Sequence, residues 1–163
     1  MRTIVVSLAW TIAASAIWAQ QPNPPTKTYS TAADVAALLA KAKADHKDGQ
    51  PTVVERILTL APYGVNLEYR TAVGPAAVHE KEAEMFYVLD GSATLVTGGK
   101  LANEKRTNAE NLTGTGIEGG KSQAVAKGDV IMVPENMPHW FSAIDGTIVL
   151  MSVHVPRSGE PKS

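Results

Sequence analysis

Three side chains in this 163-residue chain have the chemistry of metal ligands: the imidazoles of His79 and His139 and the carboxylate of Glu84. Each lies beside a run of β-favouring apolar residues and a turn glycine. Two imidazoles and one carboxylate suit a first-row divalent metal such as iron, manganese or zinc, and they leave positions open for water or substrate. The residue types therefore predict a metal centre built from His79, Glu84 and His139.

The residues that must position these ligands follow a strand pattern. From residue 52 onward, short runs rich in β-branched and aromatic residues alternate with turn residues, without intervening helices. We expect strands over residues 53–60, 65–73, 84–89, 93–97, 122–126, 130–133, 140–144 and 148–155. Asp90-Gly91 indicates a hairpin turn. This close spacing is typical of an antiparallel barrel or sandwich, in which the three ligands would converge on the interior.

The first part of the chain predicts export. Residues 1–19 begin with one basic residue and continue almost wholly apolar, the pattern of a secretory signal peptide; an uncleaved membrane anchor is the alternative. Residues 20–29 contain three prolines and predict a flexible leader. The chain has no cysteine, so no disulfide can form. We therefore expect a secreted or periplasmic protein that leaves the membrane after signal cleavage.

The remainder is long enough for a single domain with a real core. Residues 30–50 predict one helix, with a capping box that begins at Thr31. Residues 51–157 predict the barrel, and residues 158–163 a short C-terminal tail. Within the barrel, residues 98–121 are polar and rich in glycine, which predicts a long insertion loop. This segment has two possible interpretations, a lid over the barrel mouth and a tolerated surface insertion.

Charge and missing motifs narrow the class of partner. The chain has 15 Lys and Arg residues and 16 Asp and Glu residues, which gives a formal net charge of −1. Without a basic cluster, nucleic acid is not an expected partner. The sequence holds no nucleophile elbow, phosphate-binding loop or dinucleotide fingerprint, and it has no cysteine nucleophile. These observations favour a small molecule, or a second copy of the chain, as the partner.

Two stretches around the candidate ligands resemble the two motifs of the cupin family. The first motif reads G-x5-H-x-H-x(3,4)-E-x6-G and the second G-x5-P-x-G-x2-H-x3-N. The chain keeps six of the ten marked positions, which are His79, Glu84, Gly91, Gly128, Pro134 and His139. It departs from the motifs at Thr71, Ala77, Asn136 and Ala143. The resemblance implies an all-β fold, a double-stranded β-helix or jelly-roll barrel, with one N-terminal helix outside it.

The resemblance also implies a metal site, with one departure. Cupins commonly hold a divalent transition metal through three histidines and one glutamate, and Ala77 stands where the first histidine would be. A replacement donor could come from Tyr69, Glu80, Glu82 or His154. We interpret His154 as a packed or edge histidine. For Glu80 and Glu82, solvated hairpin charges and replacement donors are equally good interpretations. The alternative to a metal site is a hydrogen-bonded polar remnant of one.

Four further side chains are candidates for contact with a small molecule. Tyr69 and Arg70 lie on the strand before the first motif, and Phe86 and Phe141 flank the expected ligands. An interior Arg70 would clamp a carboxylate or phosphate, whereas an exposed Arg70 would only pair with Glu68. The two phenylalanines would line an apolar pocket or belong to the core. No catalytic residue beyond the metal ligands is identified.

The resemblance implies a metal-dependent enzyme that acts on a small organic molecule. Oxygenase chemistry comes first, because the ligand set is similar to the two-histidine, one-carboxylate triad of iron oxygenases. Isomerase or lyase chemistry is an alternative, and so is a non-catalytic barrel that binds a sugar or organic acid. A structural or interaction protein that uses only the barrel surface is a third reading. The family also implies a homodimer.

Overall fold

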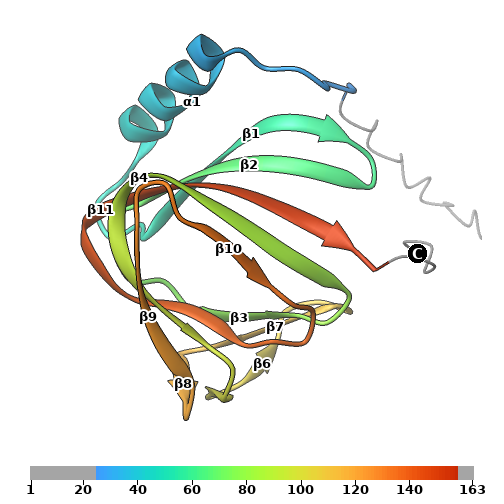
Figure 1. The fold of residues 1–163 in the computed structure, drawn as a ribbon, viewed down its shortest axis with the longest axis vertical. Coiled ribbons are helices and arrows are strands. Elements are labelled where there is room, and N and C mark those ends of the chain that lie inside the picture. The colour runs from blue at the N-terminus through green and yellow to red at the C-terminus, as the bar shows by residue number, and fades with distance from the viewer. Residues whose placement is uncertain (1–24, 158–163) are drawn as a thin grey trace, which may run out of the picture.

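The structure, a computed structural model, describes residues 25–157. The expected signal peptide, the first half of the leader and the C-terminal tail lie outside these residues. Within them, one helix lies outside a barrel of strands, which confirms the expected all-β fold with a single helix (Figure 1). The elements are α1 Ala32–Asp45, β1 Thr52–Leu60, β2 Tyr63–Arg70, β3 Ala76–His79, β4 Glu82–Thr97, β5 Lys100–Ala102, β6 Lys105–Arg106, β7 Asn111–Gly114, β8 Gly116–Glu118, β9 Lys121–Ala126, β10 Val130–Val133 and β11 His139–Pro156. No helix in this part of the chain is long and apolar enough to span a bilayer.

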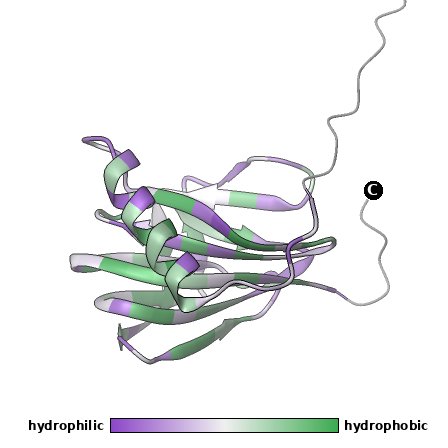
Figure 2. Ribbon diagram, turned by 90° about the horizontal axis from the view of Figure 1, so that it is seen from above, coloured by the Kyte–Doolittle hydropathy of each residue, from purple (hydrophilic) through white to green (hydrophobic). Residues whose placement is uncertain are grey.

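Helix α1 begins at the capping box. The Thr31 hydroxyl accepts a hydrogen bond from the Asp34 amide at 3.1 Å, and the Asp34 carboxylate accepts one from the Thr31 amide at 2.9 Å. The helix lies across the outer face of the sheet (Figure 2). Its apolar stripe covers β1, β2 and β11 through Val35, Leu38, Leu39 and Ala42. The predicted helix is therefore confirmed.

The barrel is built around two long strands, β4 and β11. They pair antiparallel from Glu82 opposite Pro156 to Thr97 opposite His139. The other edge of β4 pairs with β10 and then β9. The other edge of β11 pairs with β2 near its C-terminal end and with β3 at His139. Alternate side chains of these strands fill the interior with Phe86, Val88, Leu95, Val125, Val133, Phe141, Ile148 and Leu150.

The hairpin predicted at Asp90-Gly91 is wrong. Strand β4 continues through both residues, and the register against β11 shifts on either side of them. Gly91 has a φ of 82°, and a Cβ there would lie 2.0 Å from the carbonyl oxygen of Thr147. Glycine is therefore required both by the left-handed backbone and by the close approach of β11. The turn signal marks a bend inside a continuous strand.

The segment over residues 98–121 differs from the expected loop. It contains four short strands, of which β7 extends the sheet by pairing with β3, and β5 pairs with β8. In the β3–β7 pair, His79 lies opposite Asn111 and Ala77 opposite Thr113. The segment carries little apolar alternation, so β7, and β6 beside it, depend on the edge that β3 presents, while β5 and β8 form a separate two-stranded sheet. It therefore forms one wall of the barrel beside the candidate ligands.

Candidate metal centre

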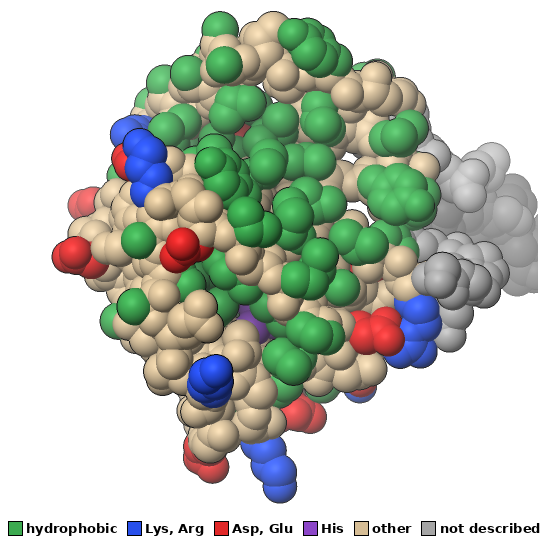
Figure 3. All heavy atoms as spheres, viewed as in Figure 1, with side chains coloured by type: hydrophobic (Ala, Val, Ile, Leu, Met, Phe, Trp, Pro, Cys, Tyr) green, Lys and Arg blue, Asp and Glu red, His purple; other side chains and the backbone are tan. Residues whose placement is uncertain are grey.

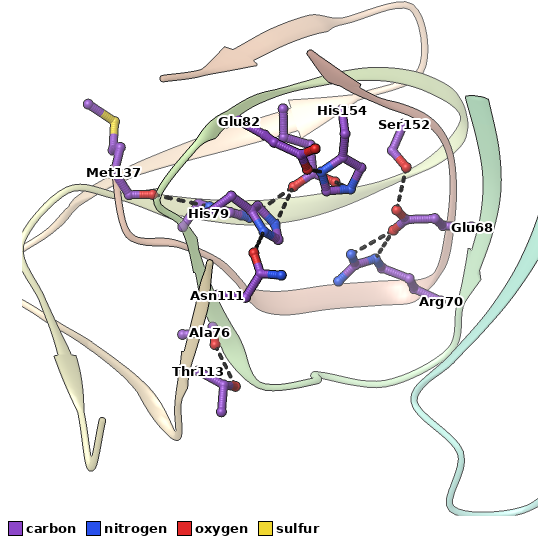
Figure 4. Close-up of polar contacts among 12 residues, drawn as sticks. Glu68, Arg70, Ala76, His79, Glu82, Asn111, Thr113, Met137, Ser152 and His154 are labelled. Atoms are coloured by element: carbon purple, nitrogen blue, oxygen red, sulfur yellow. Dashed lines mark hydrogen bonds and ion pairs between the residues drawn. The ribbon is translucent and has the colours of Figure 1, made fainter. Parts of the chain in front are cut away.

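Glu84 lies among three histidines inside the barrel. It is 4% exposed, and its side chain shares the interior face of β4 with Phe86. Its Oε2 atom lies 3.2 Å from His79 Nε2 and 3.1 Å from His139 Nε2. Its Oε1 atom lies 3.3 Å from His154 Nε2. One carboxylate thus contacts three imidazoles, two of which, His79 and His154, are labelled in Figure 4.

Three strands bring the four side chains together. His79 ends β3, Glu84 lies near the start of β4, and the long β11 supplies a histidine from each end. His154 is the direct cross-strand partner of Glu84, and His139 is the partner of Ala77, two residues before His79. Because cross-strand partners on one face have Cβ atoms about 5 Å apart, this register places all four on the same interior surface.

The donor atoms fit a transition metal. His79, Glu84 and His154 each offer an atom that lies within 4.8 Å of the other two. His139 lies outside that group but contacts the same carboxylate oxygen as His79, and the two rings are 5.3 Å apart between centroids. Three imidazole nitrogens and one carboxylate suit iron, manganese or zinc. The fold thus brings together the three predicted ligands, His79, Glu84 and His139. His154 joins them, although it was not predicted to be a ligand.

The interpretation of His154 as a packed or edge histidine did not include the contacts that its ring makes at the site. Its Nε2 atom faces Glu84, and its Nδ1 atom is buried 3.1 Å from Glu82 Oε2 without the alignment of a hydrogen bond. The sequence signal that places His154 inside the barrel is its alternation with Leu150 and Ser152 on the inward face of β11. The site therefore contains three imidazoles, although Ala77 occupies the position of the first histidine in the motif.

Two backbone and side-chain acceptors orient the histidine rings. His79 Nδ1 donates to the side-chain oxygen of Asn111 at 2.7 Å, and His139 Nδ1 donates to the Met137 carbonyl at 3.2 Å. With Nδ1 protonated in both rings, the Nε2 lone pairs point toward the centre of the site, as metal ligation requires. Asn111 was not predicted from the sequence, because no motif marks it and its segment was expected to be a loop.

The departure from the second motif at Asn136 has a local explanation. Asn136 has a φ of 60°, in the left-handed region that asparagine tolerates better than most residues with a side chain. It thereby replaces the motif glycine without breaking the turn between β10 and β11. Its amide donates to the His79 carbonyl at 2.8 Å, which ties the turn before His139 to the strand that carries His79.

Burial and the mutual contacts shift the ionisation of the site. Burial, the largest single effect, raises the pKa of Glu84, but hydrogen bonds from His139 and His79 outweigh it and hold that pKa well below its usual range. Burial lowers the pKa of His79, yet hydrogen bonds with Glu84 and Asn111 outweigh it and leave that pKa above its usual value. Glu84 is therefore ionised at neutral pH, and a proton on His79 competes with a metal ion.

Replacing Asn111 by Ala should weaken metal binding roughly 10–100-fold, since it removes the acceptor that orients the His79 ring. The substitution also removes one hydrogen bond that raises the pKa of His79, so protons compete less strongly for that ring. The loss of metal affinity relative to wild type should therefore be larger at about pH 8 than at about pH 6. Competition titrations against a zinc indicator measure both values. Asn108→Ala, in the same segment, is the control, and wild-type affinity in Asn111→Ala would contradict this role.

The four candidate substrate residues divide between the two faces of the sheet. Arg70, Phe86 and Phe141 face the interior, where the Arg70 guanidinium lies 4.8 Å from the Phe141 ring centroid. Phe86 meets Phe141 edge to face at 5.4 Å, and the two buried rings form a floor below His139. Tyr69 lies on the opposite face, among the apolar residues under α1. It is therefore not next to the histidines.

Arg70 is interior but already paired. Its Nε and Nη2 atoms donate to Glu68 Oε2 at 2.9 and 2.6 Å, and Ser152 Oγ donates to Glu68 Oε1 at 2.6 Å. Glu68 is only 5% exposed, which excludes the alternative of a solvated surface pair. Figure 4 shows this network inside the barrel, beyond His154. The charge of Arg70 is thus balanced within the protein.

A cavity of about 460 Å³ opens beside the histidine cluster. Its lining includes Glu82 and His154 at the site, and Arg56, Tyr63 and Asn66 from β1 and β2. A volume in this range suits a small organic molecule. A second cavity of about 490 Å³ lies between β4, β9 and β11 around Ala93, and no histidine lines it. Of these two cavities, the first is the one lined by a candidate ligand, His154.

Comparison with solved structures found proteins that are similar to this chain. KdgF from Halomonas sp. is 14% identical over 69% of this chain and 86% of its own, with a TM-score of 0.50. A cupin superfamily protein from Desulfitobacterium hafniense DCB-2 is 12% identical over 69% and 83%, with a TM-score of 0.48. A variant of PAC13 from Streptomyces, in a structure with uridine, is 11% identical over 70% and 77%, also at 0.48.

The likeness to KdgF concerns the fold alone, because the identity is low. No curated protein matched the chain. The sequence model of the family described as Cupin matches residues 53–159, which is more than half of the chain and includes all four clustered side chains. The β-barrel, the two partly kept motifs and this match agree. The chain belongs to the cupin family.

Proposed function

We propose that this protein is a metal-dependent cupin that holds iron, manganese or zinc through His79, Glu84, His139 and His154 and acts on a small organic molecule. The observation that carries the proposal is the contact of three imidazole nitrogens with one buried carboxylate, all within 3.3 Å. Such a metal would supply Lewis-acid or oxygen-binding chemistry. Oxygenase-like activity is our first choice of reaction class.

The residues of the chain would bind and orient the substrate around this site. The cavity beside His154 admits a small molecule, while Phe86 and Phe141 close the floor against water. Glu82 lines the cavity and lies 3.1 Å from His154 Nδ1, so it is the carboxylate placed to hold a proton near a bound substrate.

A non-catalytic barrel that binds a sugar or organic acid is the second candidate. The observation in its favour is that the interior cation, Arg70, is neutralised by Glu68 and so offers no free electrophile to a reaction. Isomerase or lyase chemistry would need the same metal and the same proton carrier as the first candidate. The metal site is common to all of these readings, and the reaction separates them.

The test is the metal content of residues 20–163, purified without a metal-binding tag and measured by plasma mass spectrometry. We expect close to one transition-metal ion per chain, followed by oxygen uptake with small organic acids as substrates. Metal without turnover of any substrate would favour the binding protein. A folded protein that contains no metal and takes up none on addition would overturn the proposal.

We also propose that the protein is exported and that it forms a homodimer. Export rests on the apolar run over residues 1–19. The dimer is supported by the outward face of β10, where Val130 and Met132 are 68% and 58% exposed, and by the apolar side chains gathered over this side of the barrel (Figure 3). Sedimentation equilibrium tests the dimer, and a monomer at all concentrations would contradict it.

A further inference from the structure

An arginine lies in the cavity that His154 lines. Arg56, on β1, lines the 460 Å³ cavity together with Asn66, which is its cross-strand partner on β2. Among residues 25–157, the Arg56 side chain has no hydrogen-bond or ion-pair partner. Arg70, by contrast, is held by Glu68. Arg56 is thus a cation available to a ligand in this cavity.

Gly64 explains why the guanidinium lies there. A Cβ on Gly64 would be 1.8 Å from Arg56 Nη1 and 2.9 Å from its Cζ, so the guanidinium occupies the space that any side chain would take. The φ of Gly64 is not in the left-handed region, so the backbone alone does not require glycine. The absence of a side chain at this position therefore serves to seat the Arg56 head group.

The seat of Arg56 is next to the proposed metal ligands. Gly64 is the direct cross-strand partner of His154, whose own partner on the other side is Glu84. Directly opposed residues in a sheet have Cβ positions about 5 Å apart, so the guanidinium lies within one small molecule's length of His154. A ligand that contacts Arg56 at one end can reach the histidine cluster with the other.

We propose that Arg56 determines specificity, by binding a carboxylate or phosphate group of the small molecule that the site takes. The fork of guanidinium donors matches the two oxygens of such an anion. The neutral Asn66 and Tyr63 adjoin it, and the negative Glu82 in the same cavity lies on the His154 side. The ligand is therefore an anionic small molecule with its charged group directed away from the metal ligands. This inference rests on the proposed function.

The test uses zinc-loaded residues 20–163 and two probes, succinate and inorganic phosphate, with succinamide as the neutral control. Isothermal titration should detect one of the anions and not the amide. Arg56→Gln should lower the affinity for the anion roughly 10–100-fold, as expected for loss of a charge-assisted hydrogen-bond pair. Gly64→Ala should do the same, because its Cβ displaces the guanidinium while the charge remains. Lys105→Gln, which removes one exposed positive charge on β6, should change nothing.

The outcomes separate this inference from the function it rests on. Zinc affinity should be equal in wild type, Arg56→Gln and Gly64→Ala. If the wild-type protein does not bind zinc, the proposed metal site is refuted, and the role of Arg56 in anion binding is not. Zinc binding without binding of either anion would overturn the role of Arg56. Anion binding that is the same in wild type and Arg56→Gln would overturn it as well. The stronger of the two probes identifies carboxylate or phosphate as the preferred group.

Discussion

Replacing Glu84 by Gln should leave the protein unable to retain a transition metal, with affinity lowered by more than about 100-fold. Within residues 25–157, Glu84 is the one residue that contacts all three imidazoles, and its lowered pKa keeps it ionised at neutral pH. The amide of Gln has nearly the same shape but carries no charge to balance the metal. The effect should therefore be on metal binding and not on the shape of the barrel.

Metal content and zinc titration of Glu84→Gln give the measurement, and circular dichroism reports the fold. Glu80→Gln is the matched control. Glu80 lies four residues earlier and is paired with Arg106 at 2.7 and 2.9 Å on the surface, so its loss should leave metal binding unchanged. A stoichiometric metal ion held by Glu84→Gln as tightly as by wild type would refute the central role of this carboxylate.

His154→Ala should lower metal affinity by at least about 100-fold, because it removes one of three imidazoles from a site with a single carboxylate. The chain offers a rescue. Ala77 precedes His79 by two residues on β3, shares its face and lies opposite His139. A second substitution, Ala77→His, should therefore return an imidazole to the site and recover most of the lost affinity.

Zinc titrations of the single and double variants test this prediction. His46→Ala is the control, because His46 contacts Gln50 and Thr71 at the end of α1 and should not affect metal binding. If His154→Ala binds zinc as wild type does, His154 is not a ligand. If the single variant loses zinc and the double variant does not recover it, His154 keeps its role and β3 does not present residue 77 to the metal.

The local signals in the sequence predicted local structure well. The capping box at Thr31 places the start of α1 because its hydrogen bonds involve only neighbouring residues. The strand runs were recognisable because interior and exterior side chains alternate along each strand. The hairpin predicted at Asp90-Gly91 was wrong, because a glycine with positive φ is equally suited to a hairpin turn and to a bend in a long strand. What lies opposite that glycine decides between them.

The ligand types and the barrel could be read from the chain, because His79, Glu84 and His139 are spaced as in the family motifs. The role of His154 could not, since it depends on the register that sets β11 beside β4, joining residues 70 positions apart in sequence. Asn111 and Arg56 reach the site in the same way, through the pairing of β7 with β3 and of β1 with β2. Sequence determined which residues are capable of binding a metal. Strand register, a long-range property of the folded sheet, decided which of them meet.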